Sequence, residues 1–223
     1  MKNILIFMSN HATLGSSDEA NGTYAAELTH AVAEFEKAGF SYDIASIKGG
    51  DAPLYGVDDF DDQAHRELMG NTNFLAKVSA TKKASDLSVS GYDAIFYPGG
   101  FGLLSDLASN TDVAKLTAQH YEAGGLVGAV CHGPAALLPI ELSNGEKLLA
   151  DKKVTGFTRE EEVAAGTIDK IPFVLEDSLE ENALSYVKVA DWQEHVIVDG
   201  RVITGQNPAS AHGVGKAMVA ALS

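Results

Sequence analysis

Apolar residues along this chain form short runs that alternate with segments of helical spacing. Residues 4–8 are a continuous apolar run, which is typical of a central parallel strand covered on both faces. Residues 23–38 carry apolar side chains at helical spacing, and Gly39 follows as the residue that ends the predicted helix. The same pattern predicts further strands at 42–47, 91–97 and 126–130, a helix at 111–123 and the start of another helix at 133–139.

The C-terminal part is less regular but contains clear turn signals. Asp199-Gly200 between two apolar runs predicts a tight hairpin, and residues 207–222 predict a helix with Asn207 as N-cap and Pro208 in its first turn. Residues 48–90 are the most polar stretch, and we expect an insertion with helical pieces that covers one face or edge.

The order of these elements predicts the fold class. Alternating strands and helices imply a flavodoxin-like, doubly wound α/β fold: a mostly parallel sheet with helices on both faces and a small added hairpin. Because no repeat or composition break marks a boundary, residues 1–223 are expected to form one domain.

Composition and charge narrow the classes of partner. Hydrophobic residues make up 45% and charged residues 21% of the chain, so a globular fold is expected rather than disorder. The formal net charge of −15 repels phosphate backbones and anionic lipids, which argues against nucleic acid and membranes as partners. The apolar run near the N-terminus is too short to span a membrane, and a single cysteine forms no disulfide within the chain. A cytoplasmic protein is therefore expected.

The one cysteine lies in a sharp turn between two predicted elements. A buried strand ends at Val130 and a helix begins only after Gly133, so Cys131 occupies the corner, as in a nucleophile elbow. The following helix N-terminus favours a thiolate, which predicts a reactive cysteine of low pKa. A free cysteine is more often an inert core residue. Here the turn and the adjacent His132 favour a nucleophile.

A second glycine turn supports this interpretation. Gly99 and Gly100 follow another predicted strand and would lie at the same sheet edge as Cys131, where their N–H groups could bind an oxyanion.

The other histidines and the tryptophan indicate no cofactor. The histidines lack HExxH or paired metal-ligand spacing, there is no CxxC, and the glycine-rich stretches lack a nucleotide-binding fingerprint. We therefore expect neither a metal nor a nucleotide cofactor, and we interpret Trp192 as a packing residue. The histidines concerned are His11, His30, His65, His120, His195 and His212.

Over nearly its whole length the sequence resembles the ThiJ/PfpI superfamily, whose fold is that of class I glutamine amidotransferases. The resemblance is strongest to the branch that contains glyoxalase III and small heat-shock-type chaperones. It is carried by the segments AAELTHAVAEFEKAGF, FYPGGFG, AVCHGPAALL, VTGFTREEE and ITGQNPASAHGVG.

This resemblance implies a set of site residues. The family's helix-1 glutamate corresponds to Glu27, its cysteine and histidine to Cys131 and His132, and its triad acid to Glu162, with Glu161 as the nearest competitor. From pattern alone, Glu27 and the glutamate run would be surface residues.

One position departs from the family pattern. Much of the branch has histidine in a Gly-Gly-His-Gly motif where this chain has Phe101, which puts any polar role at that position in doubt. Oxyanion contacts from the N–H groups of Gly100 and His132 are independent of that change.

Three functions follow as hypotheses. The first is cofactor-independent action on small reactive carbonyls, as in glyoxalase III, which converts methylglyoxal into lactate and is a lyase; protein deglycation is a variant. The second is a PfpI-type cysteine peptidase or amidase, and the third is a redox-sensing stress chaperone without turnover. The resemblance also implies a homodimer.

Overall fold

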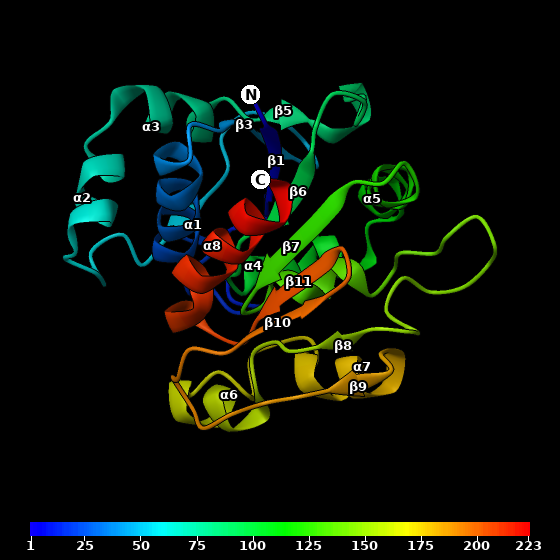
Figure 1. The fold of residues 1–223 in the computed structure, drawn as a ribbon. Coiled ribbons are helices and arrows are strands. Elements are labelled where there is room, and N and C mark those ends of the chain that lie inside the picture. The colour runs from blue at the N-terminus through cyan, green and yellow to red at the C-terminus, as the bar shows by residue number, and fades with distance from the viewer.

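A seven-stranded sheet forms the centre of the computed structural model, which describes residues 1–223 (Figure 1). All neighbouring strands are parallel except for one antiparallel pair at one edge. From edge to edge the strands are β10 (Val196–Asp199), β11 (Val202–Gly205), β7 (Leu126–Val130), β6 (Ala94–Tyr97), β1 (Asn3–Met8), β3 (Ser41–Ser46) and β5 (Lys82–Lys83). Two further two-stranded sheets pair β2 (Thr23–Tyr24) with β4 (Leu54–Tyr55), and β8 (Lys153–Val154) with β9 (Ser185–Tyr186).

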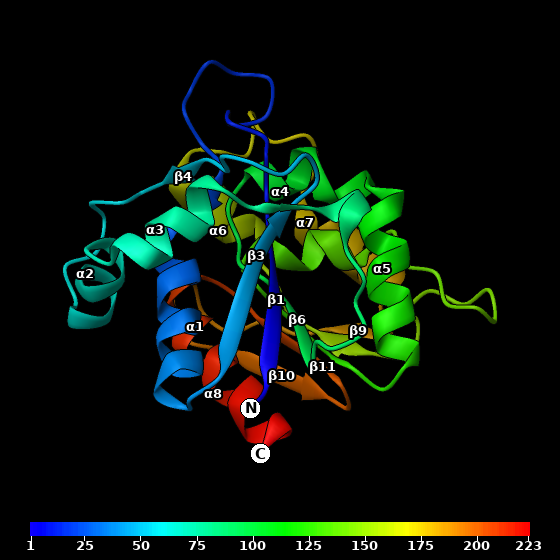
Figure 2. The same ribbon diagram turned by 90° about the horizontal axis from the view of Figure 1, so that it is seen from above.

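Helices cover both faces of the central sheet. The helices α1 (Ala25–Lys37) and α8 (Ala211–Leu222) pack together on one face, whereas α5 (Thr111–Glu122) lies on the other, as the two views in Figures 1 and 2 show. The remaining helices are α2 (Gln63–Met69), α3 (Thr72–Ser79), α4 (Gly102–Ser105), α6 (Arg159–Ala165) and α7 (Leu175–Asn182), with short 3-10 helices at Ala84–Asp86, Leu107–Ser109, Gly133–Leu137 and Pro208–Ser210. No helix combines the length and the apolar character that a membrane span requires.

The strand β1 shows why its apolar run is continuous. Ile4, Ile6 and Met8 point into the core beneath α1 and α8, whereas Leu5 and Phe7 point into the core on the opposite face. Successive side chains of a strand alternate between faces, so a strand covered on both sides needs apolar residues at every position. The predicted doubly wound, mostly parallel sheet is confirmed.

The predicted hairpin at Asp199-Gly200 is also confirmed. It joins β10 to β11 in antiparallel register, with Gly200 at a φ of +58°. This hairpin extends the parallel sheet at the edge next to β7.

Two predicted helix starts are wrong in detail. The helix expected after the cysteine turn is only the 3-10 helix Gly133–Leu137, in which Pro134 occupies the first turn. Asn207 does not cap the C-terminal helix, because a 3-10 turn at Pro208–Ser210 precedes α8 and the Asn207 side chain instead donates to Glu161 Oε1 at 2.8 Å.

The polar segment 48–90 forms β4, α2, α3 and β5. Its helix α2 packs against α1, and β4 pairs with β2 just before α1 begins. The segment thereby carries Tyr55 and Asp59 to the C-terminal edge of the sheet, where they line the cavity beside Cys131.

Candidate active site

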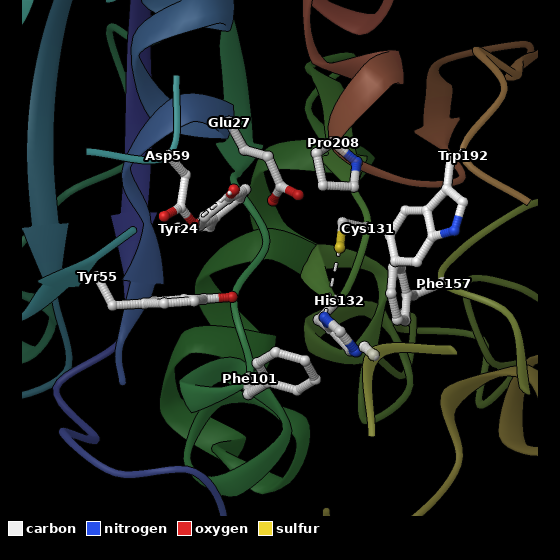
Figure 3. Close-up of a pocket in the computed structure, with 11 residues that line it drawn as sticks. Tyr24, Glu27, Tyr55, Asp59, Phe101, Cys131, His132, Phe157, Trp192 and Pro208 are labelled. Atoms are coloured by element: carbon white, nitrogen blue, oxygen red, sulfur yellow. Dashed lines mark hydrogen bonds between the residues drawn. The ribbon is translucent and has the colours of Figure 1, made fainter. Parts of the chain in front are cut away.

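Cys131 lies in the strained turn that its sequence context predicts. Its φ of +59° is in the left-handed region, which side chains other than glycine rarely adopt. The turn is held from both sides: the Cys131 N–H donates to Gly205 O at 2.9 Å, and its carbonyl accepts from Phe157 N at 3.0 Å. Cys131 as a residue is only 4% exposed, yet it forms part of the wall of a cavity (Figure 3).

The turn at Gly99-Gly100 faces this thiol closely. A Cβ at Gly99 would collide with Glu27 Oε2 and lie 2.7 Å from Cys131 Cβ, so only glycine fits there. Gly100 has a φ of +118°, which likewise requires glycine. The N–H groups of Gly100 and His132 donate to no protein atom. Gly99 therefore lies beside the cysteine, and the part of Gly99 and Gly100 in binding an oxyanion stays a prediction.

The imidazole of His132 connects the thiol to a buried carboxylate. His132 Nδ1 lies 3.4 Å from Cys131 Sγ, and His132 Nε2 lies 2.7 Å from Glu162 Oε1. The hydroxyl of Thr167 donates to the other oxygen of Glu162. A thiol, an imidazole and a carboxyl group thus form one hydrogen-bonded chain, which is the arrangement that a nucleophile, its base and an orienting acid require.

The neighbouring Glu161 is equally buried but has different partners. Its Oε2 accepts from Thr158 N–H at 3.0 Å in a capping box at the start of α6, and its Oε1 accepts from Trp192 N–H and Asn207 Nδ2, each at 2.8 Å. Glu161 therefore joins three segments of the chain, while Glu162 alone contacts His132. Of the two glutamates that the sequence left open, Glu162 is the one beside the imidazole.

Glu27 occupies the opposite side of the thiol, in the first turn of α1. Its carboxyl is fully buried, and neither oxygen has a hydrogen-bond partner of normal geometry. Burial raises the pKa of Glu27 to about 8, although the adjacent Cys131 thiol and Gly99 N–H oppose this shift. The carboxyl is thus mostly protonated at neutral pH.

The low pKa expected for Cys131 is wrong for this resting site. Burial, and then the nearby carboxyl groups of Glu27, Glu161 and Glu162, raise the pKa of the thiol well above its usual value. The short 3-10 helix that follows Cys131 provides a weaker dipole than a full α-helix, so these opposing effects dominate. The thiol is therefore neutral at rest, with His132 Nδ1 3.4 Å from its sulfur.

Aromatic rings enclose the imidazole and the cavity. His132 lies between Phe101 and Phe157, with ring centroids 4.4 and 4.5 Å away. The cavity has a volume of about 180 Å³, and Figure 3 shows its walls around the sulfur. Its lining residues are Tyr24, Glu27, Tyr55, Asp59, Phe101, Cys131, His132, Phe157, Ala165, Trp192 and Pro208.

Sequence reasoning missed part of this lining. Trp192 was expected only to pack, but it lines the cavity at 46% exposure and has a φ of +61°. Cys131 and Trp192 are the only non-glycine residues with positive φ in the chain, and both face this cavity. Tyr55 and Asp59 were also missed, because they lie in a polar insertion with no periodic signal; the hydroxyl of Tyr24 donates to Asp59 Oδ2 at 3.0 Å.

Comparison with known proteins gives consistent matches over the whole chain. The model of the DJ-1/PfpI family matches residues 19–221. Glyoxalase 3 of Candida albicans is 32% identical over 231 residues, which cover 99% of this chain and 98% of that protein. A glutathione-independent glyoxalase of Saccharomyces cerevisiae is 30% identical, with 95% of this chain and 94% of that protein covered.

Solved structures agree with these sequence matches. The crystal structure of glyoxalase III from Candida albicans superposes with a TM-score of 0.91 at 30% identity, covering 100% of this chain and 98% of the other. The Rapid Encystment Protein of 24 kDa from Francisella tularensis superposes with a TM-score of 0.95 at 34% identity, and both chains are covered completely.

Proposed function

This chain belongs to the DJ-1/PfpI family, and from that premise we propose that it is a glutathione-independent glyoxalase that converts small α-oxoaldehydes such as methylglyoxal into α-hydroxy acids. The single observation that carries the proposal is the position of the Cys131 sulfur, which faces both a histidine and an unpaired carboxyl in one small cavity. No cofactor is needed, because the reaction moves hydrogen within one substrate and adds water.

The first step is attack of the sulfur on the aldehyde carbon. His132, 3.4 Å from Sγ, removes the thiol proton as the C–S bond forms, and Glu162 stabilises the resulting imidazolium through the contact at Nε2. The unpaired N–H groups of Gly100 and His132 are the donors available to the developing oxyanion. Protonation of this oxygen gives a hemithioacetal.

The second step moves a proton between the two substrate carbons. Glu27 is suited to it, because its pKa of about 8 lies near neutrality and its carboxyl has no competing partner. Its carboxylate form removes the C1 proton to give an enediolate, in which the hydroxyl proton on C1 passes to the C2 oxygen. The acid form of Glu27 then delivers its proton to C2. C1 is thereby oxidised to a thioester while C2 is reduced to an alcohol.

The third step is hydrolysis of the thioester. Water attacks C1, the C–S bond breaks, and the Cys131 thiol is regenerated with release of the hydroxy acid. Methylglyoxal and one water thus give one lactic acid, with no external oxidant or reductant.

The decisive experiment is incubation with methylglyoxal in the absence of glutathione. We expect lactate to form with the wild-type protein and to fall to background in Cys131→Ala, whose circular dichroism spectrum should match that of the wild type. Equal lactate from both proteins would exclude the proposal.

The alternatives fit the geometry less well. A peptidase needs room for a chain on both sides of the sulfur, but aromatic residues and segment 48–90 enclose this cavity of about 180 Å³. A redox sensor needs an accessible thiolate, whereas Cys131 as a residue is 4% exposed and the pKa of its thiol is raised. Hydrolysis of early protein glycation adducts would use the same thiol, imidazole and Glu27 carboxyl, and this activity stays a prediction.

The assembly and location expected from the family resemblance are also proposals. We propose a homodimer in the cytoplasm. Sedimentation equilibrium measures the mass of the assembly, and fractionation of the native host cells measures the location.

A further inference from the structure

Three side chains that can bind metals come from distant parts of the sequence and meet beside α1. His30 lies in α1, Asp62 immediately precedes α2, and His212 is the second residue of α8. One possible ligand atom from each lies within 4.8 Å of the other two. His30 is buried, and the other two are partly exposed, so solvent reaches the group from one side. We name these residues the 30–62–212 cluster.

The contacts within the cluster hold its ligand atoms in place. Asp62 caps α2 with one oxygen, which accepts from His65 N–H at 3.0 Å, and directs the other at His30 Nε2 over 2.7 Å. The imidazoles of His30 and His212 are stacked, with ring centroids 4.4 Å apart. Glu34 Oε1 lies 3.0 Å from His212 Nδ1 and adds a second carboxylate.

We propose that the 30–62–212 cluster binds a divalent transition-metal ion, with zinc as the best fit. Two imidazoles and a carboxylate are the nitrogen and oxygen donors that Zn²⁺ takes in tetrahedral sites, and calcium or magnesium would require mainly oxygen ligands. The carboxylates of Asp62 and Glu34 together balance the charge of one divalent cation. Glu34 also orients His212, as second-shell carboxylates do for metal-bound histidines.

The rearrangement that binding requires is small. Zinc–ligand distances of about 2.0–2.1 Å place tetrahedral ligand atoms roughly 3.4 Å apart. The distance between His30 Nε2 and Asp62 Oδ2 is 2.7 Å and must lengthen toward this value. The other distances between ligand atoms, which reach at most 4.8 Å, must shorten toward it. Asp62 and His212 are partly exposed and would have to rotate, with the stacked His212 ring tilting so that its nitrogen points at the ion.

The cluster is separate from the proposed catalytic groups. His132 and Cys131 make their own contacts, and His65 is occupied by Thr29 Oγ1 and Val57 O, at 2.8 Å each. A metal here would instead fasten the loop before α2 to α1 and α8. That loop carries Asp59, which lines the cavity, so the ion would brace one cavity wall.

Sequence spacing gives no sign of this group. Its members are separated by 32 and 150 residues, whereas local motifs place ligands within a few positions of each other. Only the packing of α2 and α8 against α1 brings them together.

The test is calorimetric titration of the metal-free full-length protein with ZnCl₂. We expect about one equivalent to bind to the wild type and to Cys131→Ser, which removes the thiolate as a competing ligand. Asp62→Asn keeps the helix cap but replaces the carboxylate ligand with a weaker amide, and His212→Ala removes an imidazole ligand. Each substitution should lower the affinity for zinc at least tenfold. His11→Ala, a histidine outside the cluster, should bind as the wild type does.

Cobalt provides a second readout of the ligands. Co²⁺ bound at the cluster should give visible d–d bands without a sulfur-to-cobalt charge-transfer band, and zinc should raise the melting temperature of the wild type but not of Asp62→Asn. A sulfur band that disappears in Cys131→Ser, unchanged zinc affinity in Asp62→Asn and His212→Ala, or no zinc binding to the wild type would each overturn the proposal.

Discussion

Glu27 at the start of α1 and Glu161 at the start of α6 are both completely buried near the same sulfur, but their surroundings are opposite. Glu161 accepts hydrogen bonds from Thr158, Trp192 and Asn207, and more weakly from Gln206. Glu27 accepts none of normal geometry. Four donors satisfy the buried carboxyl of Glu161, whereas desolvation dominates at Glu27 and favours its protonated form.

The difference suggests a structural role for Glu161 and a role in proton transfer for Glu27. Glu161 ties together α6, the segment around Trp192 and the segment before α8, so the fold depends on its hydrogen bonds. Glu27 destabilises the fold when it ionises, and that same property keeps a transferable proton beside Cys131 at neutral pH. Substitutions at the two positions should therefore affect different measurements.

The largest expected effect is on catalysis in Glu27→Gln. The amide keeps the shape of the side chain but cannot carry a proton between the substrate carbons, so kcat/KM for methylglyoxal should fall about 10³-fold, equivalent to about 4 kcal/mol. Lactate formation measures the change, with Glu180→Gln, an exposed residue of α7, as the control. A fall of less than tenfold would remove Glu27 from the proton-transfer step.

The next effect is on stability as a function of pH. The Glu27 carboxyl ionises near its ordinary value of 4.5 in the unfolded chain and near 8 in the folded protein, so between these values the folded state binds the extra proton. Wild-type stability relative to Glu27→Gln should therefore be greatest below about pH 4.5, decline up to about pH 8 and stay constant above it. At pH 7 the variant should be more stable by about 3 kcal/mol, at about 1.4 kcal/mol per pH unit.

Urea denaturation of both proteins at pH 5 and pH 8 measures this difference. A wild-type-minus-variant stability that is the same at both pH values would show that Glu27 titrates normally.

A change of opposite sign and smaller size, a loss of stability, is expected for Glu161→Gln. The amide reverses one set of hydrogen bonds by presenting a donor to Thr158 N–H or to Asn207 Nδ2, so the free energy of unfolding should fall by about 2 kcal/mol. Activity per folded molecule should change less than tenfold. Glu162→Gln is the matched neighbour, and it should show the reverse: a smaller effect on stability and a larger one on kcat, because Glu162 contacts His132.

The smallest effect is expected at the ring that covers His132. Phe101→His restores the residue common in this branch, keeps an aromatic group 4.4 Å from the imidazole and adds a polar atom to the cavity wall. Steady-state kinetics should show a change in KM for methylglyoxal of less than about fivefold, or below 1 kcal/mol. A loss of kcat of two orders of magnitude would instead place position 101 in the proton-transfer chemistry.

The regular part of the fold follows from sequence patterns because it depends on local physics. The run at 4–8 must be apolar on both faces, and the glycines and proline around Cys131 allow only a sharp turn there. Glu27 is different: on an amphipathic helix it has no local feature that marks it as buried, and only the family resemblance selects it.

The aromatic wall and the thiol pKa lie beyond what local patterns determine. Tyr55 and Trp192 reach the cavity through tertiary packing of irregular segments. The low thiol pKa follows from the adjacent helix terminus alone, whereas burial and the carboxyl groups from α1 and α6 act in the opposite direction. A pKa is a property of all surrounding groups, so a single neighbour cannot predict it.

The edge strand β5 has a consequence for how the protein behaves at high concentration. It is only two residues long, and both Lys82 and Lys83 are exposed. A short, positively charged edge offers few backbone groups for pairing and repels an identical edge, so the open sheet does not template aggregation from this side. Replacing both lysines with β-branched residues should promote self-association on heating without altering the cavity.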